Sequence, residues 1–255
     1  MRKIYLRNAH SLLAFPVMAF KVLSVVGALL SANVNANSIS LSGYGTPTVD
    51  GFLDMGEWVS AGTTSFSVGL PDGSTTLGTL SVMNDSVNLY FAVCIDGVSE
   101  RGSVGFDFDN NNLDGSTQVP GDDAIVYNSE SGFFDDVRVG TSLFGFQDID
   151  VGGTVDGGGA FSVVGGATIY ELFHPLDSAD DANDFSLGAG DIVGFNLHVV
   201  MIDSSYPTAS TYFPGSPGVP ATWGDIHIVP TPAASLLFGT GLAGLFGVAR
   251  RKKTV

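Results

Sequence analysis

The chain has 255 residues, of which 44% are hydrophobic and 14% are charged, and its formal net charge at pH 7 is −16. Nucleic acid is excluded as a partner, because a protein that binds phosphates needs a basic surface. The single cysteine, Cys94, cannot form a disulfide within the chain, and its apolar surroundings "LYFAVCI" predict a small packed residue.

The first 36 residues have the pattern of a secretory signal peptide. Four basic residues between Arg2 and Lys21 precede an apolar run at 22–30. A small-x-small site follows at 34–36, and we predict cleavage after Ala36. A permanent N-terminal membrane helix is the alternative, which the shortness of the apolar run disfavours.

Residues 37–228 are predicted to form one all-β domain. Short runs rich in β-branched and aromatic residues are separated by Gly, Asn and Asp. These runs are 65–70, 78–85, 87–96, 103–109, 123–128, 166–173, 192–203 and 224–229. The pattern predicts an antiparallel β-sandwich of jelly-roll or immunoglobulin-like type, with a barrel as the alternative.

Two further segments are rich in turn-forming residues. The glycine-rich segment 152–168 is predicted to be a hairpin whose turn lies at 157–159. Residues 206–220 carry four prolines and are predicted to be an extended loop.

The stretch "DFDNNNLDG" at 107–115 is the best local candidate for a metal site. In an extended strand, Phe106 and Phe108 point to one face, so Asp107 and Asp109 share the other. The predicted ligands are oxygen donors of this stretch and of the next strand: Asp107, Asp109, Asn111, Asp114, Asp122 and Asp123. Several hard oxygen ligands favour Ca²⁺. The alternative is a solvated turn rich in Asn and Asp that holds no ion.

The charge of the middle of the chain also favours bound cations. All 26 acidic residues lie between Asp50 and Asp225, where Arg101 and Arg138 are the only basic residues. Mutual repulsion of this kind destabilises a compact domain. Bound Ca²⁺ or a salty environment is the expected remedy.

A second acidic loop and three histidines are weaker candidates. The loop at 174–191 contains Asp177, Asp180, Asp181 and Asp184, and it is predicted to be exposed, with a cation site as the alternative. Past the predicted signal peptide, the histidines are His174, His198 and His227. A three-histidine zinc site is disfavoured, because no H-x-H or HExxH spacing occurs.

Trp58 and Trp223 are the candidate ligand-binding residues. Aromatic faces stack on sugar rings, and the neighbouring Glu57 and Asp225 can accept hydrogen bonds from sugar hydroxyls. For each tryptophan the alternative is a role in packing.

The C-terminal segment 229–255 begins "VPTPAA", with Pro230 and Pro232. Seventeen uncharged residues follow at 233–249, enough for a helix of roughly 25 Å. Four basic residues at 250–253, beginning with Arg250 and Arg251, then form a cytoplasmic stop. We predict a transmembrane helix with a basic tail, and the alternative is a buried helix of the domain.

The order of prolines, apolar helix and basic cluster resembles the PEP-CTERM sorting signal of Gram-negative bacteria. Thr231 stands where the name-giving motif has Glu. The resemblance implies export through the inner membrane, transient anchoring, and processing by an exosortase. The protein would then reach the cell surface or the extracellular space.

Four other pieces resemble family-nine-like carbohydrate-binding modules and the related DOMON-type sandwiches. They are "TPTVDGFLDMGEW", "LSVMNDSVNLYFAVCI", "GFDFDNNN" and "YELFHPLD…FSLGAGDIVGFNLHVV", in the expected order over 46–228. The resemblance implies a β-sandwich, frequent Ca²⁺ and often sugar binding. It places Trp58 on a motif position that often serves packing.

These patterns together predict a non-catalytic, carbohydrate-binding-like domain of an exported protein associated with extracellular polysaccharide. One alternative is a structural matrix protein stabilised by Ca²⁺ without a specific ligand. The other is a hydrolase that acts on polysaccharide.

Overall fold

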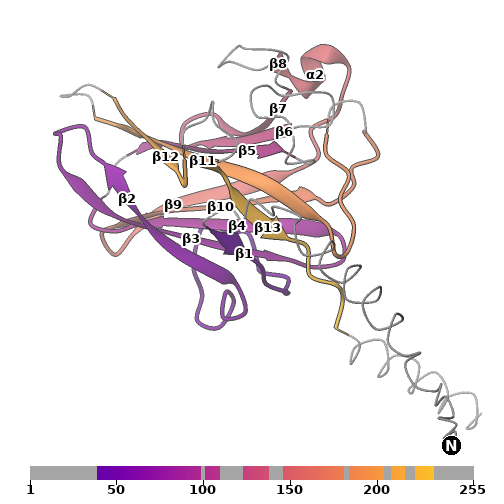
Figure 1. The fold of residues 1–255 in the computed structure, drawn as a ribbon. Helices are drawn as coiled ribbons and strands as arrows, with labels where there is room; N and C mark the ends of the chain where they lie inside the picture. Colours follow the sequence, from indigo (N-terminus) through magenta and orange to yellow (C-terminus); the bar gives the residue numbers. More distant parts are fainter. Residues whose placement is uncertain are drawn as a thin grey trace, which may run out of the picture. The chain divides into compact units, whose positions relative to one another are not determined.

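The computed structural model describes residues 39–98, 101–109, 123–137, 146–180, 184–203, 208–215 and 222–232. These residues form strands in two sheets and one short helix (Figure 1). The strands are β1 (Ser40–Leu41), β2 (Gly62–Gly69), β3 (Thr75–Asn84), β4 (Asn88–Ile95), β5 (Arg101–Asp109), β6 (Asp123–Asn128), β7 (Gly132–Val137), β8 (Phe146–Gln147), β9 (Gly158–Val164), β10 (Ala167–Pro175), β11 (Ile192–Ile202), β12 (Ala209–Phe213) and β13 (Gly224–His227). The helix is α2 (Asp148–Val151).

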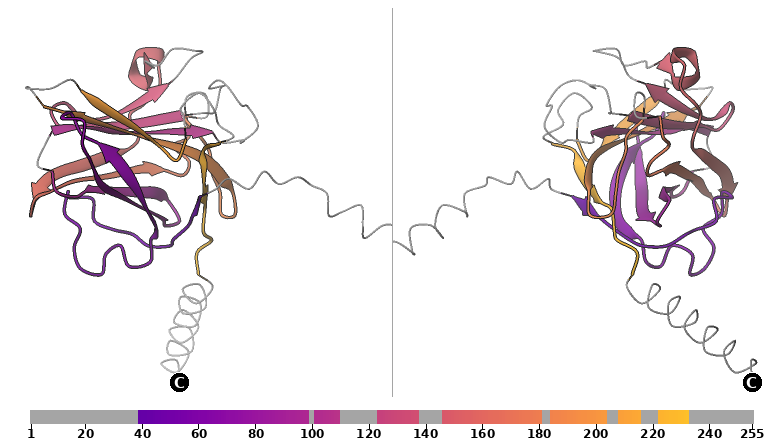
Figure 2. Two further views of the ribbon diagram at one scale, coloured as in Figure 1. Left: turned by 60° about the vertical axis from the view of Figure 1, so that its left-hand side comes forward. Right: turned by 90° about the vertical axis from the view of Figure 1, so that its right-hand side faces the viewer.

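The larger sheet has the order β1-β13-β11-β5-β6-β7-β8, and β12 also pairs with β11. The smaller sheet has the order β2-β3-β4-β10-β9. Only the pair β1–β13 is parallel among these strands. The two sheets lie face to face (Figures 1 and 2), which confirms the predicted sandwich.

The core lies between the sheets, because alternate residues of each strand point inward. Phe91 of β4 packs against Phe106 of β5 with ring centroids 4.3 Å apart. Phe108 is fully buried beside them, so the predicted inward face of β5 is confirmed. All eight predicted strand runs are strands in the structure.

The glycine-rich hairpin has a different register from the predicted one. Val164 pairs with Ala167, so the turn consists of Gly165 and Gly166 and not of residues 157–159. Both turn glycines have positive φ, 62° and 83°, as a tight two-residue hairpin turn requires. Gly158 and Gly159 instead belong to β9.

The predicted loop 206–220 contains a strand, because β12 pairs with β11. The chain that follows β12 reaches the outer face of the larger sheet, where the Asn196 side chain donates a hydrogen bond to the Gly215 carbonyl (2.9 Å). Asp107 and Asp109 lie on this outer face, as predicted, yet each is only 3% exposed.

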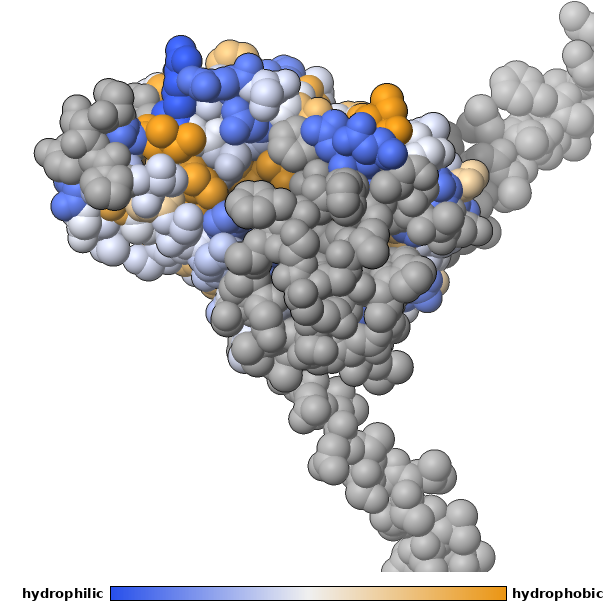
Figure 3. All heavy atoms as spheres, turned by 90° about the horizontal axis from the view of Figure 1, so that it is seen from above, coloured by the Kyte–Doolittle hydropathy of each residue, from blue (hydrophilic) through white to orange (hydrophobic). Residues whose placement is uncertain are grey.

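Seen from the side of α2 and β8, hydrophilic and hydrophobic residues are interspersed on the described surface (Figure 3).

Within the part of the chain that the structure describes, no helix is long and apolar enough to cross a membrane. The predicted transmembrane segment 233–249 lies outside that part.

Candidate functional site

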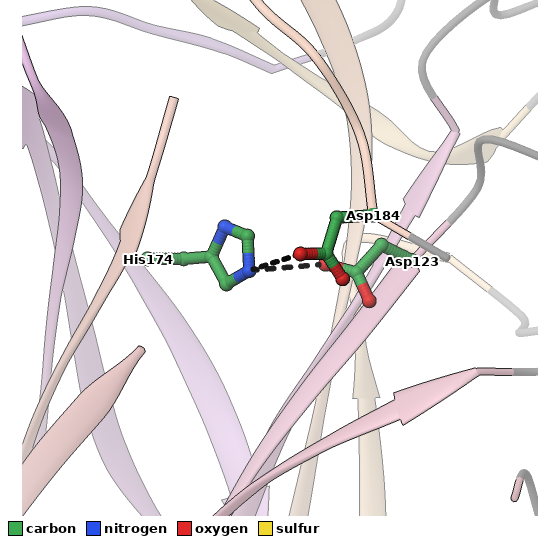
Figure 4. A group of neighbouring side chains, drawn as sticks. All are labelled: Asp123, His174 and Asp184. Atoms are coloured by element: carbon green, nitrogen blue, oxygen red, sulfur yellow. Dashed lines mark ion pairs between the residues drawn. The ribbon is translucent and has the colours of Figure 1, made fainter. Parts of the chain in front are cut away.

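Three buried side chains converge at one edge of the space between the sheets. They are Asp123 at the start of β6, His174 in β10, and Asp184 in the connection from β10 to β11. The Nε2 atom of His174 lies 3.7 Å from Oδ2 of Asp123 and 3.9 Å from Oδ2 of Asp184 (Figure 4). All three side chains are excluded from solvent.

The strand pattern explains why two of these side chains point inward. In β10, Tyr170, Leu172 and His174 alternate with outward residues and are all fully buried. In the larger sheet, Asp123 pairs with Phe108, so both side chains lie on the inner face. A polar pair from opposite sheets therefore meets inside the sandwich.

The connection after β10 folds back on itself and brings in Asp184. The backbone amide of Leu187 donates to the Leu176 carbonyl (2.7 Å), and the Asp184 amide donates to the Asp180 carbonyl (2.9 Å). Phe185 is buried at 1% exposure, which fixes its neighbour Asp184 against the core. The prediction of an exposed loop is therefore wrong for Asp184.

The orientation of the His174 ring is fixed on two sides. Its Nδ1 atom lies 2.7 Å from the Pro175 carbonyl oxygen, which can only accept, so Nδ1 carries the hydrogen. The Phe185 ring packs against the imidazole at a centroid distance of 4.6 Å. The remaining ring nitrogen, Nε2, consequently faces the two carboxylates.

The distances around Nε2 are too long for hydrogen bonds. Among the described residues, Nε2 of His174 and both carboxylate oxygens of Asp184 have no hydrogen-bond partner. Buried charge is costly unless it is paired or coordinates a metal. The arrangement has the donors, the burial and the open centre that a cation site requires.

A second group adjoins the first, because Asp184 belongs to both. One ligand atom each from Asp156, Asp180 and Asp184 lies within 4.8 Å of the others. Thr154 donates from its amide to Asp180 (3.2 Å) and from its hydroxyl to Asp156 (2.5 Å). This group offers only oxygen ligands and is more exposed than the first.

The predicted calcium ligands do not all come together. Asp123 lies on the inner face of the larger sheet, whereas Asp107 and Asp109 lie on the outer face. Neither of the latter belongs to a metal-ligating group among the described residues. Asn111, Asp114 and Asp122 lie outside those residues.

The three histidines are not grouped in the described part of the chain. His174 lies between the sheets, while His198 of β11 stacks on Tyr212 of β12 at 4.3 Å. His227 lies on β13. The disfavoured three-histidine zinc site is therefore not formed by these residues.

Trp58 helps to hold the segment 50–58 on the outer face of the smaller sheet. Its indole N–H donates to Glu171 of β10 (2.9 Å), whose other oxygen accepts from the amides of Asp50 and Gly51 (3.0 and 2.8 Å). Burial raises the pKa of Glu171, although these hydrogen bonds oppose the shift. The ring of Trp58 is half-buried, and Phe52 in the same segment is 47% exposed.

Trp223 is only 4% exposed, so its ring has no open face on which a sugar could stack. This placement contradicts the prediction that Trp223 binds ligand, and it matches the alternative role in packing.

The chain leaves the sandwich immediately before the predicted sorting motif. The Asn84 side chain accepts from the Val229 amide (2.8 Å) and donates to its carbonyl (3.0 Å). Pro230 and Pro232 follow and are exposed. Ala36, Arg250 and Arg251 lie outside the described residues.

A surface pocket of about 270 Å³ lies beside this exit. Its lining includes Asp85, Leu176, Asp177, Leu187 and Val229. The pocket therefore adjoins the acidic connection between β10 and β11.

The fold resembles that of two solved structures of a family 9 carbohydrate-binding module from Caldicellulosiruptor kristjanssonii, one in complex with cellotriose and one with glucose. The TM-score is 0.54 for both, and the sequence identities are 20% and 19%. The alignments cover 76% of this chain and 94% and 97% of the module. No protein-family model and no curated protein matches the sequence. The likeness shows a shared fold, and a fold alone does not fix a function.

Proposed function

We propose that the sandwich is a non-catalytic, carbohydrate-binding-like module of an exported protein and that it associates with extracellular polysaccharide. The observation that carries the proposal is the fold, which is shared along nearly the whole length of a module solved with cellotriose and with glucose. The sequence pieces that resemble such modules support it.

Export belongs to the proposal through the two ends of the sequence. The segment 1–36 is proposed to direct the chain across the inner membrane of a Gram-negative bacterium. The segment 229–255 is proposed to anchor it until an exosortase-type enzyme processes it near Pro230 and Pro232. The two hydrogen bonds between Asn84 and Val229 support a boundary between the sandwich and the sorting segment at this point, because cleavage beyond Pro232 would leave these bonds and the sandwich intact.

The segment 50–58 is the proposed site of sugar contact. It presents the exposed Phe52 and the half-buried Trp58 ring, and Glu171 holds it in place. A segment that is already ordered loses little conformational entropy on binding. Aromatic rings supply large contact areas at such sites.

The test is a glycan-binding measurement on the purified full-length chain, with cello-oligosaccharides and bacterial exopolysaccharides as ligands. Trp58→Ala should weaken binding at least about tenfold, which corresponds to about 1.4 kcal/mol. Trp58→Phe retains an aromatic face and should keep most of the affinity, although it loses the hydrogen bond to Glu171. Tyr212→Ala, on the other sheet, is the control and should bind normally.

Three results would count against the proposal. Absence of binding to every glycan would favour the structural matrix protein. An equal loss of glycan affinity in Trp58→Ala and Trp58→Phe would mean that Trp58 only holds the segment 50–58 to Glu171 and does not contact sugar. Release of reducing ends from any polysaccharide would mean that the domain is a hydrolase.

A further inference from the structure

We propose that Asp123, His174 and Asp184 bind one divalent transition-metal ion of the Zn²⁺ class, which fastens the two sheets to the connection between β10 and β11. This inference is independent of sugar binding. It rests on the side chains drawn in Figure 4.

The ligand atoms of the three side chains are spaced as ligands of a shared ion. Nε2 of His174 lies 3.7 and 3.9 Å from the nearest carboxylate oxygens, beyond hydrogen-bond range. Ligands that share one ion at about 2.0–2.4 Å lie about 3–4 Å from each other. The observed separations therefore fit an ion at the centre better than direct contact.

The other ring nitrogen of His174 has the partner that a metal-bound histidine needs. Metal-bound histidines almost always donate their second N–H to a carbonyl or carboxylate, which fixes the ring and its tautomer. The Nδ1–H of His174 faces the Pro175 carbonyl at 2.7 Å, and Phe185 packs on the ring. The Nε2 lone pair is thus already aimed between Asp123 and Asp184.

The charge of the two aspartates also favours a bound cation. Two carboxylates face each other in a space closed to solvent, and both oxygens of Asp184 lack a hydrogen-bond partner there. A divalent cation balances two carboxylate charges and supplies what those oxygens lack. Arg101 is the one lysine or arginine among the described residues, and it lies exposed on the surface in an ion pair with Glu130.

The imidazole decides the class of ion. Nitrogen ligands suit Zn²⁺ and neighbouring transition metals, whereas Ca²⁺ and Mg²⁺ prefer oxygen alone. The adjoining group of Asp156, Asp180 and Asp184 contains only oxygen donors. Metal binding that depends on His174 therefore distinguishes the proposed site from the adjoining oxygen-only group.

The experiment uses the purified full-length chain after treatment with a chelator. Calorimetric titration with Zn²⁺ should give one bound ion per chain, and Zn²⁺ should raise the melting temperature by several degrees. His174→Ala and Asp184→Asn should each weaken Zn²⁺ binding at least about tenfold. His227→Ala removes a histidine of β13 that belongs to no metal-ligating group among the described residues, so it should leave the affinity unchanged.

A measurement without substitutions covers the case in which a variant fails to fold. Co²⁺ added to the wild-type chain should show a visible absorption stronger than that of aqueous Co²⁺, because a protein site of low coordination number intensifies its bands, and Zn²⁺ should abolish this increase. Zn²⁺ binding that persists in His174→Ala would overturn the proposal. So would a wild-type chain that binds Ca²⁺ but neither Zn²⁺ nor Co²⁺.

Discussion

Glu171 shows how one side chain can hold a whole segment of this molecule. It points out of β10, away from the core, yet it is buried because residues 50–58 lie over it. Its two oxygens accept three hydrogen bonds from Asp50, Gly51 and Trp58. The sequence points to Trp58 but not to its partner, because Glu171 is 113 residues away in the chain.

We expect Glu171→Gln to destabilise the fold by about 1–3 kcal/mol. Glutamine has one acceptor oxygen in place of two, and its NH₂ group would face backbone or indole donors. Chemical denaturation measures the loss. Glu130→Gln is the matched control, because Glu130 forms a surface ion pair with Arg101 and should change stability by less than about 1 kcal/mol.

The same variant carries a pH prediction. Burial raises the pKa of Glu171 in the folded state above its unfolded value. Its contribution to stability is therefore greatest below the unfolded pKa and is lost as pH rises through the folded pKa. Unfolding free energies measured from pH 4 upward should show this decline in the wild type and lack it in Glu171→Gln. An identical pH profile in both proteins would mean that Glu171 does not titrate differently on folding.

At the scale of elements, the strands were predictable because their signal is local. Alternation of apolar and polar residues identified β5, and its inward Phe106 and Phe108 followed from it. β12 was missed because prolines on both sides make its five residues read as loop. The group of Asp123, His174 and Asp184 was not predictable, because it forms only when the two sheets pack.

The hairpin of β9 and β10 offers an element-scale prediction. Two glycine clusters compete for the turn in the sequence, and the structure selects Gly165 and Gly166, whose φ angles are positive. Gly165→Asn should be nearly neutral, since Asn-Gly favours such turns. Gly165→Val should cost about 1–2 kcal/mol, because a β-branched residue is strained at positive φ. Thermal melts of both variants test the turn, and equal stability would contradict the observed register.

At the scale of the whole molecule, acidic charge dominates. Outside the predicted targeting segments, the chain has 26 acidic residues and only two arginines or lysines, Arg101 and Arg138. Several carboxylates are buried, among them Asp107, Asp109 and Asp184. Repulsion between such carboxylates opposes folding. A cation that binds between them relieves this repulsion and therefore binds more strongly.

Calcium remains a prediction of the sequence, and the structure suggests where to test it. We expect millimolar Ca²⁺ to raise the melting temperature by about 5–10 °C over NaCl of equal ionic strength. Mg²⁺ should do less, because it gives up its waters reluctantly. The oxygen-only group of Asp156, Asp180 and Asp184 is the expected site, so Asp180→Asn should reduce the response more than Asp109→Ala. A larger loss in Asp109→Ala than in Asp180→Asn would instead place the calcium site in the stretch that begins at Asp107. Equal stabilisation by all three salts would mean that the charge is relieved by screening, because a specific site distinguishes Ca²⁺ from Mg²⁺ and Na⁺.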